Sequence, residues 1–543
     1  NFPVLISKGN DMVYAGYKTC SQTTPSYANT PLNEMPGHQG PSVNGFINCE
    51  ICGKTGYETP QMDADGYYLI ANAGNLYWFA DMVNVNSHTD ACARLTADIV
   101  INEHVLNADG SLNGTPERQW TPIGKSSSLV YSGTFDGQGH TISGLYYKGT
   151  STRIGLFGTL AGTVKNVGLV DSYLTTDKQI IGGICGLATN LVSNGTEVAV
   201  ASIQNCYNAA TIYSNFTGST PGMGGICGWI KLETPDTGTA SKVTISNCYG
   251  RGSVSTSHDT KTYVNGVLGY SPASAVNIVN SYTLTSVATV KYSTGKTDAE
   301  FANGSVTASL NGGATTGLWA QNIAEEPFPT FGSDGITYAR GTSGNKWAAL
   351  CLPFDITVAG SSMKYYEVTG TDGNNLNVKE LEQETIKGGT PFIVNIEGLD
   401  SITIKAADGT AYALTATDGN GLCGTISGED ISSGFYLDGD LFVNVAGYLA
   451  TNGHALTLAP FTAYYAGTGI TADALIITAD KALLGDANND GEVNIGDFTA
   501  IANYILGERN PNFNTAAADV NNDGDINVGD LTALANIILS GGN

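Results

Sequence analysis

The middle of the chain alternates short apolar runs with glycine and shows no helical period. A Gly-x-x-Gly motif starts at Gly155, Gly183, Gly225 and Gly266, at offsets of 28, 42 and 41 residues. Repeats of this length are typical of stacked or solenoid architectures. A coil of about 28 residues accommodates three short strands and three turns, so the pattern predicts a parallel β-solenoid over residues 65–332. The longer intervals then carry insertions into the coil.

A second motif interleaves with the first and supplies one asparagine per repeat: Asn166, Asn205, Asn247 and Asn280. If successive coils stack, these side chains form one column in which each amide hydrogen-bonds to the next. The motif therefore predicts an asparagine ladder along the repeats.

Cysteines form two further columns, Cys185 with Cys227 and Cys206 with Cys248, each pair 42 residues apart. Stacked strands lie about 4.8 Å apart, which is inside the Cα separation that a disulfide allows. Side chains in a stack point the same way, however, and this disfavours a bridge. Buried free thiols are the preferred interpretation, with disulfides as the alternative.

Residues on either side of the repeats follow other patterns. Apolar positions over 75–83 have a helical period, which predicts a helix that caps the open end of the solenoid. Its apolar face holds Leu76, Phe79, Ala80 and Val83. Residues 333–482 contain β-rich runs at 347–355, 389–395 and 459–465, which predict a β-sandwich-like domain. Cys351 and Cys423 lie in this domain, and the sequence leaves their pairing open.

Two twelve-residue segments near the end of the chain, 486–497 and 519–530, repeat each other at an offset of 33 residues. Each has oxygen-bearing side chains at positions 1, 3, 5, 9 and 12, a glycine at position 6, and a backbone carbonyl to offer at position 7. This spacing suits Ca²⁺, a hard cation that takes six to eight oxygen ligands. The sequence predicts two calcium sites with these ligands: Asp486, Asn488, Asp490, Glu492, Asn494 and Asp497; Asp519, Asn521, Asp523, Asp525, Asn527 and Asp530.

Each loop leads into a predicted helix, over 497–506 and 530–539, and the two helices are expected to pack face to face. From residue 486 to the end, nine acidic residues stand against one basic residue, so folding of this segment should be coupled to cation binding. The apolar stripes of the two helices are Phe498, Ile501, Ala502 and Ile505, and Leu531, Leu534, Ala535 and Ile538.

The paired loops resemble a dockerin, the EF-hand-like calcium-dependent docking domain of extracellular bacterial assemblies, over residues 483–543. The resemblance implies binding of a cohesin domain through loop positions 10 and 11 and through later helix positions. None of these positions is charged here: Ile495, Gly496, Ala502, Asn503, Val528, Gly529, Ala535 and Asn536. A neighbouring copy of the chain, or the chain's own β-domain, is therefore an equally open docking partner.

The repeats resemble those of secreted Bacteroidota GLUG-repeat surface proteins, and residues 133–145 are similar to the entry segment of such solenoids. Residues 333–482 resemble the β-domain that often follows these repeats. The resemblance implies a secreted, extracellular or cell-surface location and an adhesion-like role.

The composition and charge of the chain argue against nucleic-acid binding and against a membrane span. Only 13% of residues are charged and the formal net charge is −25, which argues against nucleic-acid binding, since that requires a basic face. No apolar run approaches the roughly 20 residues of a membrane span. The chain begins at Asn1 rather than Met, which we interpret as a processed or trimmed end.

Residues 1–64 form a head rich in proline and glycine. Its Cys49-x-x-Cys52 pair resembles half of a zinc ribbon, and Cys20 and His38 can complete four Zn²⁺ ligands. Zinc, disulfides and free thiols all stay open for this head.

No catalytic constellation stands out, because Gly-x-Ser-x-Gly, His-Glu-x-x-His and P-loop patterns are absent. The leading interpretation is a non-catalytic surface or matrix protein that acts in calcium-dependent adhesion or assembly, by docking or fibre formation. The alternative is a protein that binds surface glycans through aromatic residues such as Tyr213, Phe216 and Trp229. A β-solenoid enzyme that acts on polysaccharides is the least favoured.

Overall fold

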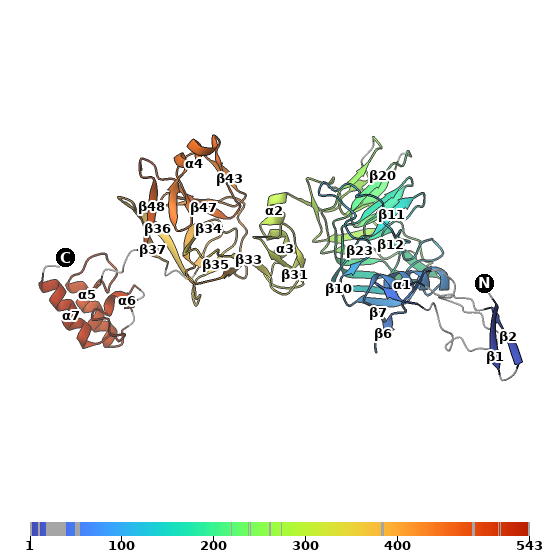
Figure 1. Cartoon of the computed structure of the whole chain (residues 1–543), viewed down its shortest axis with the longest axis horizontal. Helices are drawn as coiled ribbons and strands as arrows, with labels where there is room; N and C mark the ends of the chain where they lie inside the picture. Colours follow the sequence, from blue (N-terminus) through green and yellow to red (C-terminus); the bar gives the residue numbers. More distant parts are fainter. Residues whose placement is uncertain are drawn as a thin grey trace. The chain divides into compact units, whose positions relative to one another are not determined.

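The computed structural model describes strands β1 (Pro3–Lys8) and β2 (Asp11–Tyr17) and residues 40–48, 55–381, 385–479 and 484–540, except 219, 237, 239, 260, 261, 273, 509 and 511. The chain divides into two compact units, Asn1–Thr337 and Tyr338–Asn543 (Figure 1). Strands far outnumber helices, so the prediction of a mainly β chain is confirmed.

In the first unit the chain winds through short strands, and each strand pairs in parallel with the strand one coil later. Phe135 pairs with Val164, Val164 with Ile203, and Ile203 with Ile245. This ladder consists of β10 (Thr134–Ser143), β13 (Thr163–Val170), β19 (Ser202–Asn208), then β23 (Val243–Ser246) with β24 (Tyr249–Gly250), and β28 (Val276–Val279) with β29 (Tyr282–Leu284).

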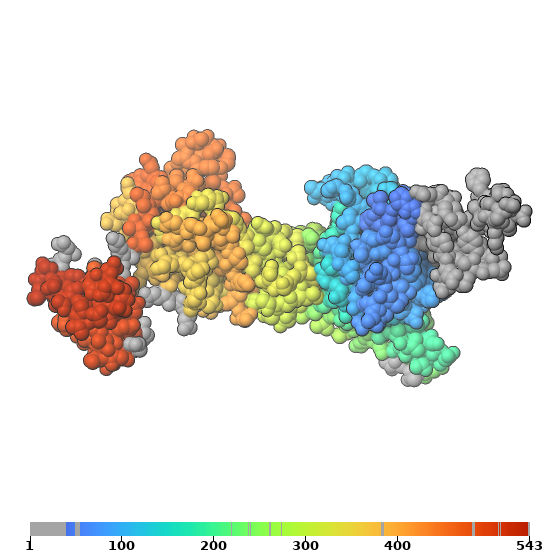
Figure 2. All heavy atoms as spheres, turned by 60° about the horizontal axis from the view of Figure 1, so that its bottom comes forward, coloured from blue at the N-terminus to red at the C-terminus, as the bar shows by residue number. Residues whose placement is uncertain are grey.

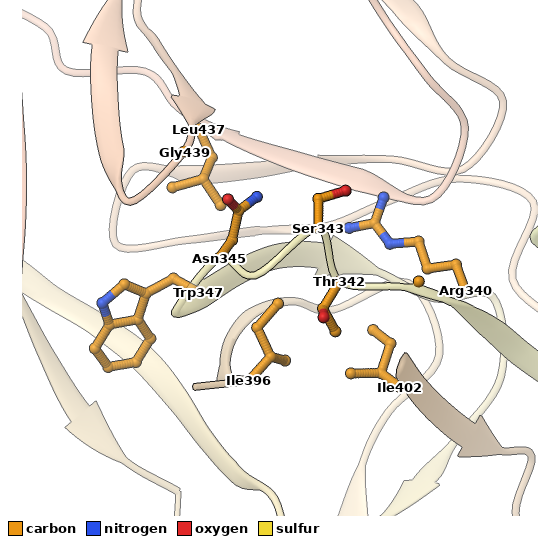
Figure 3. A pocket seen from close by; sticks show the side chains of 10 residues that line it. Arg340, Thr342, Ser343, Asn345, Trp347, Ile396, Ile402, Leu437 and Gly439 are labelled. Carbon is orange, nitrogen blue, oxygen red and sulfur yellow. The ribbon is translucent and has the colours of Figure 1, made fainter. Parts of the chain in front are cut away.

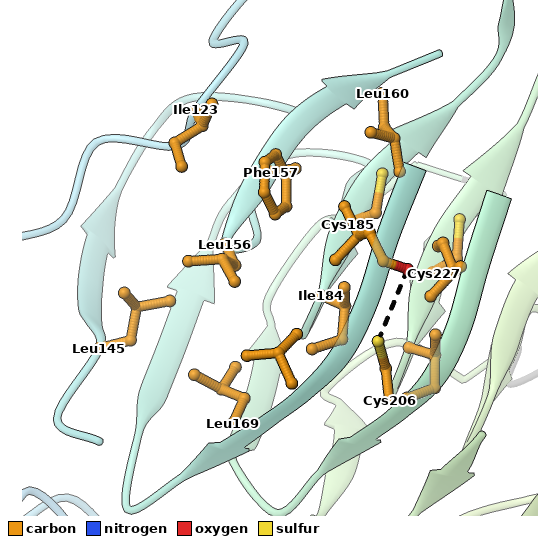
Figure 4. Packing of buried hydrophobic residues seen from close by; sticks show 14 of the residues in the cluster. Ile123, Leu145, Leu156, Phe157, Leu160, Leu169, Ile184, Cys185, Cys206 and Cys227 are labelled. Carbon is orange, nitrogen blue, oxygen red and sulfur yellow. Dashed lines mark hydrogen bonds between the residues drawn. The ribbon is translucent and has the colours of Figure 1, made fainter. Parts of the chain in front are cut away.

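Three shorter parallel ladders repeat in the same order along the chain. They are β11 (Tyr146–Gly149), β14 (Tyr173–Thr176), β20 (Thr211–Ser214) and β25 (Val254–Thr256); β12 (Phe157–Leu160), β16 (Cys185–Ala188), β22 (Cys227–Ile230) and β27 (Leu268–Tyr270); and β15 (Ile180–Gly182), β21 (Gly222–Gly224) and β26 (Val264–Asn265). Buried Ile, Leu, Phe and Cys side chains fill the space that the ladders enclose (Figure 4). One predicted insertion is the antiparallel hairpin of β17 (Asn190–Ser193) and β18 (Thr196–Val200).

The predicted asparagine ladder is confirmed for three of its four positions, Asn166, Asn205 and Asn247. Asn205 donates from its side-chain amide to Asn166 at 2.9 Å, and Asn247 donates to Asn205 at 3.1 Å. Asn166 in turn donates to the Asp136 carboxylate at 2.9 Å, and Asn280 donates to a helix carbonyl at 3.3 Å. The four asparagines have φ between +45° and +55°, a left-handed conformation that asparagine adopts more readily than most residues.

The prediction of buried free thiols in the repeats is also confirmed. Cys185, Cys206, Cys227 and Cys248 are all free and fully buried. Cys185 and Cys227 pair in register on β16 and β22. Burial raises the pKa of the Cys185 and Cys206 thiols well above their ordinary value, so these groups stay protonated.

Helix α1 (Ala73–Asn86) forms where the capping helix is predicted. Asn72 begins it by accepting a hydrogen bond from the Asn75 N–H at 2.9 Å, the usual role of an N-cap residue. Its predicted apolar face is buried in the same core as the coils: Leu76, Phe79, Ala80 and Val83.

The second unit contains a closed ring of strands, and the prediction of a β-sandwich is wrong. Eight strands follow one another in hydrogen-bonded order, and Leu350 of the first pairs with Thr462 of the last, which closes the sheet into a small barrel. Alternating apolar residues give one inward face in either architecture, so the sequence pattern cannot separate them. The strands are β34 (Trp347–Cys351), β39 (Pro391–Asn395), β36 (Lys364–Asp372), β37 (Asn375–Glu380), β48 (Ala474–Ala479), β45 (Leu441–Asn444), β44 (Phe435–Asp438) and β47 (Thr462–Tyr465).

Cys351 and Cys423, whose pairing the sequence leaves open, are both free. In β42 (Leu422–Thr425) it is Gly424 that faces the Cys351 sulfur. Successive residues of a strand point to opposite faces, so Cys423 points away from Cys351.

Candidate metal and docking site in the C-terminal module

The C-terminal module, residues 484–540, consists of two matching loop and helix segments. Helix α5 (Ile495–Ile505) follows the first loop and helix α7 (Val528–Leu539) follows the second, and the two helices pack together (Figure 1). Both start two residues earlier than predicted. The reason is that Asn494 and Asn527, predicted as metal ligands, also cap the helices by accepting from Gly496 and Gly529 N–H groups.

The first carboxylate of each loop organises the turn around it. Asp486 accepts hydrogen bonds from the N–H groups of Asp490 at 3.0 Å and Gly491 at 2.9 Å. In the second loop, Asp519 accepts the equivalent pair at 3.0 and 2.9 Å. The loops are thus folded in the same way, with their backbone N–H groups directed at a carboxylate.

The last carboxylate of each loop accepts hydrogen bonds both from the loop backbone and from the residue that caps the following helix. Asp497 accepts from the Asn488 and Asn494 N–H groups, both at 2.9 Å. Asp530 accepts from the corresponding groups of Asn521 at 3.2 Å and Asn527 at 2.8 Å. Each bond from the N-cap residue completes a capping box, so position 12 stabilises the helix start as well as offering oxygen to a cation.

The burial of these carboxylates favours a bound cation. Asp486 is 5% exposed, and Asp497 and Asp530 are fully buried. Within the described part of the chain, none of the three pairs with a lysine, arginine or histidine. A buried charge without a counter-charge is strongly unfavourable, and a cation held by the loop offsets that cost.

The donor set fits calcium better than zinc. Among the residues that the structure describes, no group of three or more His, Cys, Asp or Glu side chains gathers around one point, so the structure does not bring the carboxylates of either loop together as a metal-binding group. The choice between the two metals therefore depends on the types of donor atom in the loops. The loops combine carboxylates with amide and carbonyl oxygens, which hard cations such as Ca²⁺ prefer. Asn488 and Asn521 lie next to loop carboxylates in matching positions, each donating to the Asp two residues later at 2.8 Å.

The two helices bury only part of the predicted apolar stripes. Ile501 and Leu534 are fully buried at equivalent positions, and Phe498, Leu531 and Ile538 pack against them. Ile505 is 36% exposed, so the stripe does not extend to the end of α5. The core also includes residues that the helical period cannot reveal: Ala487, Phe513, Ala518 and Val520.

Apolar side chains also lie on the surface of the module, which is red in Figure 2. Ile495 is 71% exposed and Val528 is 65% exposed, and both occupy loop position 10. Leu506 and Leu539 are 81% and 85% exposed, and they too are 33 residues apart. The predicted apolar stripes do not include these leucines, although their equal offset from the two loops is a usable signal.

The other predicted sites are not assembled in the described residues. Cys20, His38, Cys49 and Cys52, predicted as zinc ligands, lie outside them. Tyr213 and Trp229 belong to different ladders, β20 and β22, and the Trp229 ring packs against Tyr270 with centroids 4.2 Å apart. In the part of the chain that the structure describes, no helix is long and apolar enough to cross a membrane.

Comparison with known protein families finds a match for the C-terminal module. Residues 484–539 match the family described as Dockerin type I domain. This match supports the predicted dockerin-like module and its use of calcium in docking to a protein. It covers this module and leaves the rest of the chain unassigned.

Two other similarities are more distant. Halomucin from Haloquadratum walsbyi is 29% identical over 107 residues, which are 18% of this chain and 1% of halomucin. The chain therefore spans about one hundredth of that protein's length. A crystal structure of a candidate immunoglobulin A1 protease from Bacteroides ovatus aligns with 50% of this chain and 94% of its own, at 19% identity and a TM-score of 0.34, which is too low to carry an argument about fold.

Proposed function

We propose that this chain is a non-catalytic extracellular protein that docks to a protein partner through its dockerin-like module when calcium is bound. The observation that carries the proposal is the pair of equivalent, fully buried carboxylates, Asp497 and Asp530, which form no ion pair with any residue that the structure describes. The dockerin match over residues 484–539 supports the same conclusion.

Two ions are proposed, one in each loop. The first is held by Asp486, Asn488, Asp490, Asn494 and Asp497 with the Glu492 carbonyl, and the second by the residues 33 positions later. Calcium supplies the positive charge that holds these oxygens together. The chain itself supplies the fixed loop, because its N–H groups already orient Asp486, Asp497 and their counterparts.

The docking surface is proposed to be apolar. Ile495 and Val528 are exposed beside the two loops, and Leu506 and Leu539 are exposed at the two helix ends. Burial of an exposed aliphatic side chain contributes about 1.5–3 kcal/mol, so these four side chains favour a cohesin-type partner with a matching apolar surface. A second copy of the chain is the alternative partner.

The parallel coils of the first unit are proposed to form a β-solenoid that acts as a rigid scaffold. Parallel ladders connect successive coils, and the asparagine hydrogen bonds link three of them. Such a stack has little freedom to bend within itself, which suits a spacer that presents other parts of the chain.

A binding experiment with matched variants tests the proposal. The full chain is passed over immobilised cohesin domains in calcium or EDTA, and its self-association is measured by analytical ultracentrifugation. We expect calcium-dependent binding that Ile495→Asp with Val528→Asp abolishes and that Asn512→Asp, an exposed change elsewhere in the module, leaves intact. Absence of both cohesin binding and self-association in calcium would refute the proposal.

A further inference from the structure

The second unit contains a pocket of about 200 Å³ that the docking function does not use (Figure 3). It lies where β34 begins, just after β39 ends, and at the turn from β44 to β45. Its volume is close to that of one hexose ring. The loop 341–346 supplies most of its polar side chains.

Three polar side chains at this pocket have no partner within the described residues. Within those residues the Arg340 guanidinium forms no ion pair or hydrogen bond, and it lies over the Tyr338 ring, 5.6 Å from its centroid. The Ser343 hydroxyl and the Asn345 amide make no intramolecular hydrogen bond either. Figure 3 shows the guanidinium beside Ser343, with Asn345 on the same loop. Hydrogen-bonding groups that line one pocket and have no hydrogen-bond partner are available to bind a ligand.

The loop holds Ser343 in an unfavourable backbone conformation. Ser343 has φ +55° and Gly344 has φ +77°, and the Asn345 N–H donates to the Thr342 carbonyl at 3.2 Å. A left-handed conformation is natural for glycine but costs another residue roughly 1 kcal/mol or more. Glycine at position 343 would make the same turn without strain, so the hydroxyl is kept there at a cost. Strain of this kind concentrates at functional sites.

The floor of the pocket consists of apolar side chains that are themselves largely buried and expose little surface to a ligand. Trp347 is 6% exposed, Ile396 3% and Ile402 1%, because these side chains belong to the core of the unit. A ligand therefore gains little from apolar contact and must bind mainly through the polar rim. The rim is rich in donors and carries one unpaired positive charge, which matches an anion with several oxygen acceptors.

We propose that this pocket binds a carboxylate-bearing sugar, the acidic residue of a glycan, with its carboxylate on Arg340. A planar carboxylate fits the two-pronged donor geometry of a guanidinium. The ring hydroxyls would then face Ser343 and Asn345. An amino-acid carboxylate shares the charge but lacks the hydroxyls that the other two groups recognise.

Ligand-observed NMR and calorimetry on the full chain test this site with three small probes: glucuronate, glucose, and N-acetyl-leucine. We expect saturable glucuronate binding with a dissociation constant of about 1 mM, and binding of glucose at least tenfold weaker. Arg340→Gln should weaken glucuronate binding at least tenfold. Lys379→Gln, which neutralises an exposed lysine elsewhere in the same unit, should leave it unchanged.

Ser343→Gly separates recognition from folding. It removes the hydroxyl and relieves the strained φ, so the variant should bind glucuronate more weakly while its melting temperature stays equal or rises. No saturable binding of any probe, wild-type affinity in Arg340→Gln, or preference for N-acetyl-leucine over glucuronate would each overturn the proposal.

Discussion

Asn205 donates its side-chain amide to the side-chain oxygen of Asn166, one coil earlier, at 2.9 Å. The bond repeats from Asn247 to Asn205 and ends on the Asp136 carboxylate. Each asparagine therefore fixes both a sharp left-handed turn and the register between coils. The ladder explains the asparagines of three repeats, while Asn280 shares the left-handed turn and donates to the Ser309 carbonyl instead.

Replacement of Asn205 should destabilise the repeats in two separable ways. Asn205→Ala removes two hydrogen bonds and places alanine at φ +50°, so the free energy of unfolding should fall by about 2–4 kcal/mol. Asn205→Gly removes the same bonds without backbone strain and should be about 1 kcal/mol less damaging. Urea unfolding measures both, and equal stabilities of Ala, Gly and wild type would contradict the ladder's role.

Asp136 should make the repeats acid-sensitive. Burial raises the pKa of this carboxyl, but hydrogen bonds from the Gln138 N–H, Asn166 and Lys165 outweigh it and hold the pKa below its ordinary value. The carboxylate therefore stabilises the fold at neutral pH, and this stabilisation is lost as the pH falls through the depressed pKa. Asp136→Asn should be less stable than wild type at pH 7.

The pH dependence of that difference is the measurement. Unfolding followed from pH 7 downward should show wild type and Asp136→Asn converging below about pH 4. Asp259→Asn, at an exposed position, should show no such convergence. A difference between Asp136→Asn and wild type that is independent of pH would contradict the assignment.

The thiols should differ sharply in reactivity. Cys185, Cys206, Cys227, Cys248 and Cys351 are buried, and burial raises the pKa of Cys351 to about 12. Alkylation of the native chain at pH 8, read by peptide mass spectrometry, should therefore label half-exposed Cys92 well before these five. All five should react after unfolding. A native Cys185–Cys227 disulfide peptide would contradict the free-thiol structure.

Much of the first unit can be predicted from sequence because each position returns once per coil. The glycine and asparagine motifs fix the register, and the apolar residues between them fix the core. The matching fold of the two proposed calcium loops can be predicted for a similar reason, since the spacing of their polar residues is local. Asp486 and Asp497 are only eleven residues apart.

Three features cannot be predicted from the sequence, because they depend on contacts between residues far apart in the chain or on the backbone conformation. The barrel depends on Leu350 meeting Thr462, and no local pattern reveals that pairing. The exposure of Leu506 and Leu539 depends on how α5 and α7 pack. Ser343 looks like an ordinary loop serine until its positive φ is known.

Loss of a ligand in one proposed calcium loop should weaken calcium binding at that loop and not at the other. Asp497→Asn and Asp530→Asn each remove one buried charged ligand, so each should weaken calcium at its own loop at least about tenfold and leave the other loop intact. Each variant also keeps an oxygen acceptor for the helix cap, so the helix should still form in excess calcium. Circular dichroism during calcium titration follows both effects, and a variant that loses both sites at once would contradict independent loops.

Calcium titration of the metal-free full chain by isothermal calorimetry shows whether the two loops bind calcium. We predict two bound ions per chain, with a gain of helical circular dichroism that EDTA reverses. A chain that takes up no calcium, and whose helical signal is the same in calcium and in EDTA, would contradict this prediction.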